Sequence, residues 1–142
     1  MTYFVTGATG FIGKRLVKKL LARRGTTVYF LVRKESLDKV PTLLEYWEAS
    51  EERAVPVVGD LGKAMLGVTK ADQKKLTGKI KHFFHLAAVY DLKADAESQI
   101  VANIDGTKNA VALANEIKAG VFQKLDKSLL PIRDVGHAAA RA

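Results

Sequence analysis

The sequence contains no cysteine, and several further absences narrow the classes of protein to which it can belong. Without cysteine, disulfides and thiolate metal sites are excluded. The three His residues include no His-x-x-x-His pair, which argues against a structural metal site. No apolar run approaches the roughly 20 residues of a membrane span, and glycines and basic residues interrupt the first apolar stretch too early for a signal peptide. We therefore expect a cytoplasmic protein with no membrane segment and no bound metal.

Acidic residues are missing from the start of the chain. Residues 1–34 carry eight Lys and Arg side chains and no Asp or Glu, so the whole net charge of +8 lies within them. Such an excess would steer an anionic ligand towards this region, although a surface helix also carries solvated charges of this kind on its outer face. Nucleic-acid binding is the rival interpretation, but no aromatic residues interleave with the basic helix and no nucleic-acid motif is present. A length of 142 residues fits one domain.

A turn with three evenly spaced glycines follows the first apolar run. Residues 3–5 predict a buried strand, and residues 11–24 predict an amphipathic helix. Gly7 would let the chain turn sharply, Gly10 would leave no side chain in front of a phosphate, and Gly13 would let the helix pack closely on the strand. The free N–H groups at the start of the helix would then face the phosphates of a dinucleotide. The alternative is a tight turn that binds no ligand.

The same turn resembles a known fingerprint. Thr6-Gly7-Ala8-Thr9-Gly10-Phe11-Ile12-Gly13 has the spacing G-x-x-G-x-x-G and closely resembles the nucleotide-binding motif of the extended short-chain dehydrogenase/reductase family. That family includes epimerases, dehydratases, keto-group reductases and thioester reductases. The resemblance implies an α/β fold with a Rossmann-type, doubly wound parallel sheet, here incomplete with about four to five strands. It also implies that the cofactor is contacted by Gly7, Thr9, Gly10, Phe11, Ile12 and Gly13.

The residues after the second predicted strand favour NADP(H) over NAD(H). The continuous apolar run over residues 26–32 is typical of a parallel strand buried on both faces, and it ends at Arg33 and Lys34. NAD-specific sites carry an Asp or Glu at this position, which accepts hydrogen bonds from the ribose 2′-OH. Arg33 would instead bind a 2′-phosphate, and Ser36 would add a hydroxyl donor. The alternative for Arg33 is an exposed charge at a strand end, and Glu35 lies beyond that end.

The middle of the chain continues the alternation of helix and strand. A helical region is expected over residues 37–53, with Pro41 in its first turn or breaking a shorter turn before it, and with Trp47 in the core. Residues 54–58 predict the third strand, and a short helix is expected from residue 69 or 70 to residue 76.

Two further segments resemble cofactor-contacting parts of the family. After the third strand, the carboxylate of Asp60 would accept a hydrogen bond from the adenine amine, and the N–H of Leu61 would support the ring; the alternative is that Asp60 only forms a turn. After the fourth strand, which begins near residue 81, Ala87 and Ala88 resemble the small residues beside the nicotinamide ribose. We do not assign His85 as a catalytic base, because a histidine at such a strand end is more often packed and hydrogen-bonded.

A long helix is expected over residues 94–118. Within it, Asn103-Ile104-Asp105-Gly106-Thr107 matches the family's N-x-x-G-T. Asn103 would hydrogen-bond a strand backbone. Glycine inside a helix costs about 1 kcal/mol relative to alanine, so Gly106 is expected to allow close packing against the sheet.

The resemblance stops after residue 122. A fifth strand should then deliver a Ser or Thr, followed by a Tyr-x-x-x-Lys whose Tyr hydroxyl passes a proton while the nicotinamide passes hydride. Residues 121–128 predict only a poor strand, and no Tyr of the chain is followed four positions later by Lys. We therefore assign no catalytic residue, an NADP-binding domain over residues 1–122 and a divergent tail over residues 123–142.

Two functions fit these observations. The first is an NADP(H)-dependent oxidoreductase that acts on a carbonyl, hydroxyl or acyl-thioester substrate and whose catalytic half is absent here. The second is a catalytically inactive NADP-binding sensor or interaction module. An incomplete sheet would expose a strand edge, so we also expect a homo-oligomer.

Overall fold

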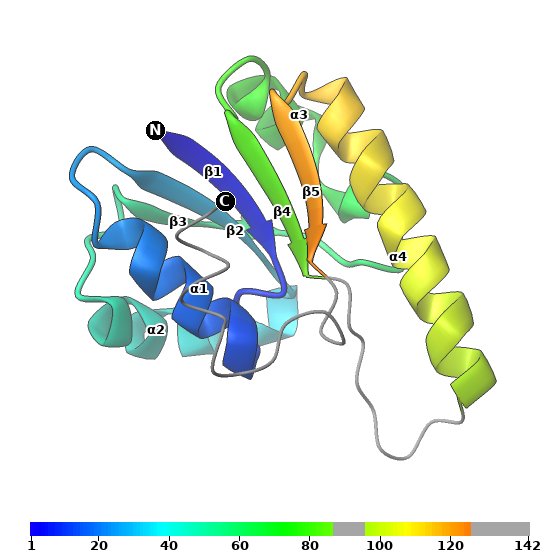
Figure 1. Ribbon diagram of the computed structural model, residues 1–142, viewed down its shortest axis with the longest axis horizontal. Helices are drawn as coiled ribbons and strands as arrows, with labels where there is room; N and C mark the ends of the chain where they lie inside the picture. The colour runs from blue at the N-terminus through cyan, green and yellow to red at the C-terminus, as the bar shows by residue number, and fades with distance from the viewer. Residues whose placement is uncertain (87–95, 126–142) are drawn as a thin grey trace.

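The computed structural model consists of a five-stranded parallel sheet between two layers of helices (Figure 1). It describes the backbone of residues 1–86 and 96–125 and the side chains of residues 1–86 and 104–124. The strand order is β3-β2-β1-β4-β5, and every neighbouring pair is parallel. The strands are β1 (Thr2–Thr6), β2 (Thr27–Val32), β3 (Ala54–Val58), β4 (His82–Leu86) and β5 (Val121–Leu125). The predicted Rossmann-type, doubly wound parallel sheet is confirmed.

Helices cover both faces of the sheet, and two hydrophobic cores lie between the layers (Figure 1). The helices are α1 (Phe11–Leu21) and α2 (Val40–Trp47) on one face and α3 (Lys70–Leu76) and α4 (Ala96–Glu116) on the other, with the 3-10 helices η1 (Lys34–Lys39) and η2 (Ala64–Gly67) following β2 and β3. Because all strands run parallel, their carboxyl ends share one edge of the sheet.

Aromatic pairs anchor both cores. On the α1 side, Trp47 meets the ring of Phe30 edge-on at 5.1 Å, and its indole N–H donates to the carbonyl of Lys14 at 2.8 Å. On the α4 side, the rings of Phe4 and Phe83 stack at 4.7 Å. Trp47 is 4% exposed, which confirms its prediction as a core residue.

Helix α1 is shorter than expected, because it ends at Leu21 and not near residue 24. The carbonyl groups at and after this helix end accept hydrogen bonds from the guanidinium of Arg53. It donates to the carbonyls of Leu21 at 2.6 Å, Arg23 at 3.0 Å and Thr26 at 3.2 Å. Arg53, which directly precedes β3, thus satisfies carbonyl groups at the end of α1 and in the loop that leads to β2.

The expected helical region over residues 37–53 is divided into two helices. The 3-10 helix η1 already begins at Lys34, and Pro41 lies in the first turn of α2, where its missing N–H costs no hydrogen bond. Helix α2 ends at Trp47 because Glu48 adopts the left-handed conformation, with φ of 53° and ψ of 43°.

The segment that predicted only a poor strand forms β5 and pairs with β4 along its whole length. The pairing runs from His82 opposite Val121 to Leu86 opposite Leu125. The ring of Phe122 lies 5.3 Å from that of Phe83, so one aromatic contact and the backbone pairing compensate for the polar residues in this strand. Strand β5 crosses the boundary that the sequence analysis placed at residue 122. Residues 126–142 lie outside the described part of the chain.

Candidate cofactor site

The predicted cofactor residues gather at the carboxyl edge of the sheet. Gly7, Arg33 and Asp60 come directly or almost directly after β1, β2 and β3, which are neighbours in the sheet. The N–H of Gly59 donates to the carbonyl of Val32 at 3.0 Å and joins the ends of β2 and β3. Residues that are distant in the sequence therefore line one edge, where ligands bind in open α/β sheets.

Two of the three glycines are required by the close approach of the turn to β4. Gly7 has a φ of +76°, and a Cβ there would lie 2.9 Å from the Cβ of Leu86. A Cβ on Gly13 would overlap the carbonyl group of Gly7 and lie 2.9 Å from the Cδ1 of Leu86. The turning role predicted for Gly7 and the packing role predicted for Gly13 agree with this geometry.

Gly10 has a different environment from the other two. It is exposed, and the nearest atom to a Cβ built there would be the carbonyl oxygen of Gly7, at 3.5 Å. Gly10 is the N-cap of α1 and provides no side-chain hydrogen bond, and the first turn of the helix contains no acidic residue. Among the described residues, no side chain therefore caps the first N–H groups of α1 beside the exposed Gly10, and uncapped helix starts of this kind bind phosphate.

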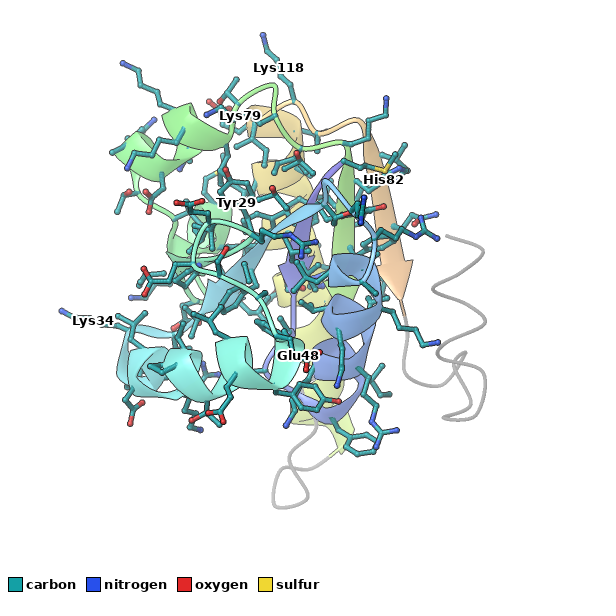
Figure 2. The ribbon with its side chains drawn as sticks, turned by 90° about the vertical axis from the view of Figure 1, so that its left-hand side faces the viewer. Tyr29, Lys34, Glu48, Lys79, His82 and Lys118 are labelled. Carbon is teal, nitrogen blue, oxygen red and sulfur yellow. The ribbon has the colours of Figure 1, made fainter. Side chains whose placement is uncertain are left out.

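The residues predicted to select NADP lie on the surface beside this turn. Arg33 is exposed and forms the N-cap of η1, and its carbonyl accepts a hydrogen bond from the N–H of Ser36 at 2.9 Å. Ser36 is half-buried, and Lys34 points away from the ribbon into solvent (Figure 2). The guanidinium of Arg33 is thus accessible to a ligand, and so is the cation next to it.

The segment after β3, which was predicted to contact the adenine, is a loop in which Asp60 has a turn-forming contact. The Asp60 carboxylate accepts a hydrogen bond from the N–H of Gly62 at 2.8 Å, as in the alternative interpretation of this residue. The carbonyl of Leu61 accepts from the side-chain amide of Asn109 at 2.8 Å, which fixes the loop to α4. This role of Asn109 has no local signal in the sequence, because the residue that it contacts is 48 positions away.

A buried histidine joins the ends of β1 and β4 to α4. The Nδ1 of His85 lies 2.6 Å from the Oγ1 of Thr6, and its Nε2 lies 3.3 Å from the Oγ1 of Thr107. The N–H of Leu86 also donates to the Oγ1 of Thr6, at 3.2 Å. Burial, together with the charge of Lys124, lowers the pKa of His85 from 6.5 to about 4, so the ring is neutral at pH 7. Thr6 and Thr107 carried no signal in the sequence beyond their motifs.

Some expectations fall outside the described residues or need correction. Ala87, Ala88 and the side chain of Asn103 lie outside the part of the chain that the structure describes. Gly106 packs against Leu61 and not against the sheet, because α4 crosses the loop after β3, and a Cβ there would lie at an ordinary 3.7 Å from the Cβ of Leu61.

The basic helix α1 places its charges on its outer face, as expected. Its buried side consists of Gly13, Leu16, Val17, Leu20 and Leu21. Two of its cations, Lys14 and Lys18, lie 4.5 Å and 4.4 Å from the ring centre of Tyr46, and the guanidinium of Arg15 lies 4.3 Å from that of Phe11. In three dimensions, a ring from α1 and a ring from α2 thus lie beside three of these cations.

Within residues 1–86 and 96–125, no helix is long and apolar enough to cross a membrane. The same residues contain no group of three side chains placed to bind a metal ion.

Comparisons with known proteins give the same picture as the geometry. The NAD-binding family model described as male sterility protein matches residues 5–125, beyond the limit set at residue 122 by the sequence analysis. A putative dihydroflavonol 4-reductase of Synechocystis sp. is 37% identical over 121 residues, which cover 84% of this chain and 30% of that protein. A putative fatty acyl-CoA reductase of Drosophila melanogaster is 30% identical over 131 residues, which cover 81% of this chain and 25% of that protein.

Solved structures extend these matches. The terminal R domain from the myxalamid PKS-NRPS biosynthetic pathway superposes with a TM-score of 0.69 and 31% identity, covering 87% of this chain and 33% of that one. The reductase domain of a nonribosomal peptide synthetase from Mycobacterium tuberculosis gives a TM-score of 0.67 and 26% identity, covering 87% of this chain and 32% of that one. This chain thus spans only about a third of the length of these proteins, or less. The expected resemblance to short-chain dehydrogenase/reductases is confirmed, and the chain belongs to the NAD(P)-binding family described as male sterility protein.

Proposed function

We propose that this chain is the NADP(H)-binding part of a reductase that acts on a carbonyl, hydroxyl or acyl-thioester substrate. The observation that carries the proposal is the start of α1, which has no side-chain cap among the described residues, no acidic residue in its first turn, and the exposed Gly10 at its N-cap. Such a helix start offers unpaired N–H groups and a positive partial charge to a pyrophosphate.

Each end of the cofactor would then meet residues that the fold brings to the same edge. The pyrophosphate would lie on the N–H groups of Phe11, Ile12 and Gly13. Arg33 and Ser36 would hold the 2′-phosphate, since both follow β2 and the guanidinium is exposed. On the adenine side, Asp60 keeps acceptor capacity for a ligand, because its Oδ1 accepts one hydrogen bond from the N–H of Gly62, whereas a carboxylate has about four lone-pair sites.

The bound nicotinamide would supply the hydride that reduces the substrate. The substrate class rests on the relatives, because the similar proteins include a putative fatty acyl-CoA reductase and reductase domains of peptide synthetases. No Tyr-x-x-x-Lys occurs among the 142 residues, so we expect cofactor binding but no turnover from them alone. NADPH-dependent reduction of an acyl thioester by these residues would contradict that expectation.

Cofactor preference provides the test of this proposal. We expect calorimetric titration to show tighter binding of NADPH than of NADH, because only NADPH carries the 2′-phosphate. Arg33→Asp should remove this preference, since a carboxylate repels the phosphate and accepts hydrogen bonds from a free ribose 2′-OH. Arg24→Asp is the matched control, because it makes the same charge change on an exposed residue beyond the other end of α1. Equal affinity of the wild-type chain for both cofactors would overturn the assignment of NADP.

We also propose that the chain self-associates by pairing of an outermost strand of the sheet with a second copy of the chain. Strands β3 and β5 are the edge strands of the sheet that the described residues form, and each carries an exposed valine, Val58 at 37% and Val121 at 42% exposure. Unpaired strand edges with apolar side chains favour pairing between chains. Sedimentation velocity should therefore show dimers or larger species whose fraction rises with concentration, and a monomer at all concentrations would contradict this.

A further inference from the structure

Three elements meet at the ring of His85. Thr6 ends β1, His85 lies in β4, and Thr107 lies in α4, and the two ring nitrogens lie within 2.6 Å and 3.3 Å of the two threonine hydroxyl oxygens. The ring is 1% exposed and also stacks on Phe122 of β5 at 6.1 Å. The partners are 79 and 22 positions away in the sequence, so the contact fixes the tertiary structure and not a local turn.

The hydrogen-bond chain has a consistent direction. The N–H of Leu86 donates to the Oγ1 of Thr6, and in the tautomer of His85 with its proton on Nε2, the hydroxyl of Thr6 donates to the Nδ1 of His85. In the neutral ring, the Nε2–H then donates to the Oγ1 of Thr107. Every polar atom of the imidazole is satisfied in this arrangement, as a buried polar group requires.

The glycine turn rests on the strand end that this chain holds in place. Gly7 follows Thr6 directly, and a Cβ on Gly7 would lie 2.9 Å from the Cβ of Leu86 and 3.1 Å from its carbonyl oxygen. A Cβ on Gly13 would lie 2.9 Å from the Cδ1 of the same leucine. Leu86 is therefore the wall against which the turn packs, and Thr6 and His85 set its position.

We propose that His85 is a positioning residue for the dinucleotide site, acting through Thr6 and Leu86 on the glycine turn. This inference rests on the proposed function, because it assumes that the turn binds the cofactor. The imidazole need not touch the ligand. It keeps the turn at the distance from β4 at which the N–H groups of α1 face the pyrophosphate, and it ties that distance to the position of α4.

His82 provides an internal control on the same strand. It lies three positions before His85, on the opposite face of the sheet, and stacks on Tyr3 at 5.6 Å. Its Nδ1 is buried and has no hydrogen-bond partner among the described residues. Replacing His82 by phenylalanine removes no hydrogen bond at that atom and keeps a ring in the stack, whereas the same replacement of His85 leaves Thr6 and Thr107 without their nitrogen partners.

The test compares NADPH affinity by calorimetry in folded proteins at pH 7, with a melting curve for each variant. We expect His85→Phe to weaken NADPH binding on the order of tenfold, the effect of losing roughly one buried hydrogen bond. His82→Phe should bind as the wild type does. His85→Asn should recover part of the affinity, because its carboxamide oxygen replaces Nδ1 as the acceptor for Thr6.

A second pair of variants tests the other end of the bond, in case His85→Phe fails to fold. Thr6→Val removes the hydroxyl at nearly constant shape and should weaken NADPH binding by a similar factor, whereas Thr6→Ser should restore it. The inference is overturned if folded His85→Phe or Thr6→Val binds NADPH as tightly as the wild type. If the wild-type chain binds no NADPH, the proposed function fails by itself, so the two failures are distinguishable.

Discussion

On the side of β1, β2 and β3, the carboxyl edge of the sheet is shaped by missing side chains, whereas on the side of β4 it is held by hydrogen bonds between distant residues. A Cβ on Gly7 or Gly13 would collide with Leu86 or with the turn itself. On the other side, His85 reaches Thr6 and Thr107 across 79 and 22 positions. The packing of the glycine turn can therefore be disrupted by adding atoms to Gly7 or Gly13, whereas the β4 side is disrupted by removing a hydrogen-bonding group.

The largest effect should come from adding a methyl group to the glycine turn. Gly13→Ala places a Cβ 2.7 Å from the carbonyl carbon of Gly7, with backbone on that side and no flexible side chain to move away. We expect the free energy of unfolding to fall by at least about 3 kcal/mol, as measured by urea denaturation. Gly10→Ala is the control, since its Cβ meets nothing closer than 3.5 Å. Equal stability of the two variants would refute the packing role of Gly13.

The next effect concerns pH and reports on the β4 side. The unfolded chain protonates His85 near pH 6.5, whereas burial and Lys124 lower its pKa in the folded protein to about 4. The unfolded state therefore binds more protons between these values, so the stability that is complete above pH 6.5 is lost as pH falls towards 4. The loss amounts to at most about 3 kcal/mol. Urea denaturation at pH 7 and pH 4.5 measures it, and His85→Asn should flatten this part of the dependence.

A smaller effect on stability is expected at the contact between α4 and the loop after β3. The side-chain amide of Asn109 on α4 donates to the carbonyl of Leu61 in the loop after β3. Asn109→Ala should cost about 1 kcal/mol, since it removes one partly buried hydrogen bond. Thermal denaturation measures the change. No change in melting temperature would mean that α4 and the loop are held by packing alone.

The smallest effect should be a gain in stability. Gly106 lies inside α4, where alanine is favoured over glycine by about 1 kcal/mol, and a Cβ there would make an ordinary contact of 3.7 Å with Leu61. Gly106→Ala should therefore raise the free energy of unfolding by up to about 1 kcal/mol in chemical denaturation. A destabilised variant would show that packing requires a glycine in α4, as it does in the glycine turn.

The same contrast explains what the sequence could predict. The strand, turn and helix around Gly7, Gly10 and Gly13 were predictable, because the spacing within thirteen residues carries the geometry. Strand β5 was underestimated, since its stability comes from pairing with β4 and from Phe122 on Phe83, which no local pattern contains.

His85 is buried and hydrogen-bonded as expected, but its partners and the contact of Asn109 were not predictable, for a related reason. The N-x-x-G-T pattern over residues 103–107 includes Thr107 but carries no information on its contact with His85 in β4. The early end of α1 likewise depends on Arg53, which comes from the start of β3. Local spacing thus predicts the elements, and long-range side-chain contacts set their ends and their attachment.

The central claim is that the start of α1, beside Gly10, binds the pyrophosphate of NADP(H). Calorimetric titration of NADPH into the wild-type chain and into Gly10→Val tests it most directly, because valine places a side chain at the exposed N-cap of the helix, whose backbone, with φ of −77° and ψ of 170°, accepts one. The account predicts micromolar binding to the wild type and none to the variant, with equal melting temperatures. Absence of binding to the wild type, or equal binding to both, would contradict it.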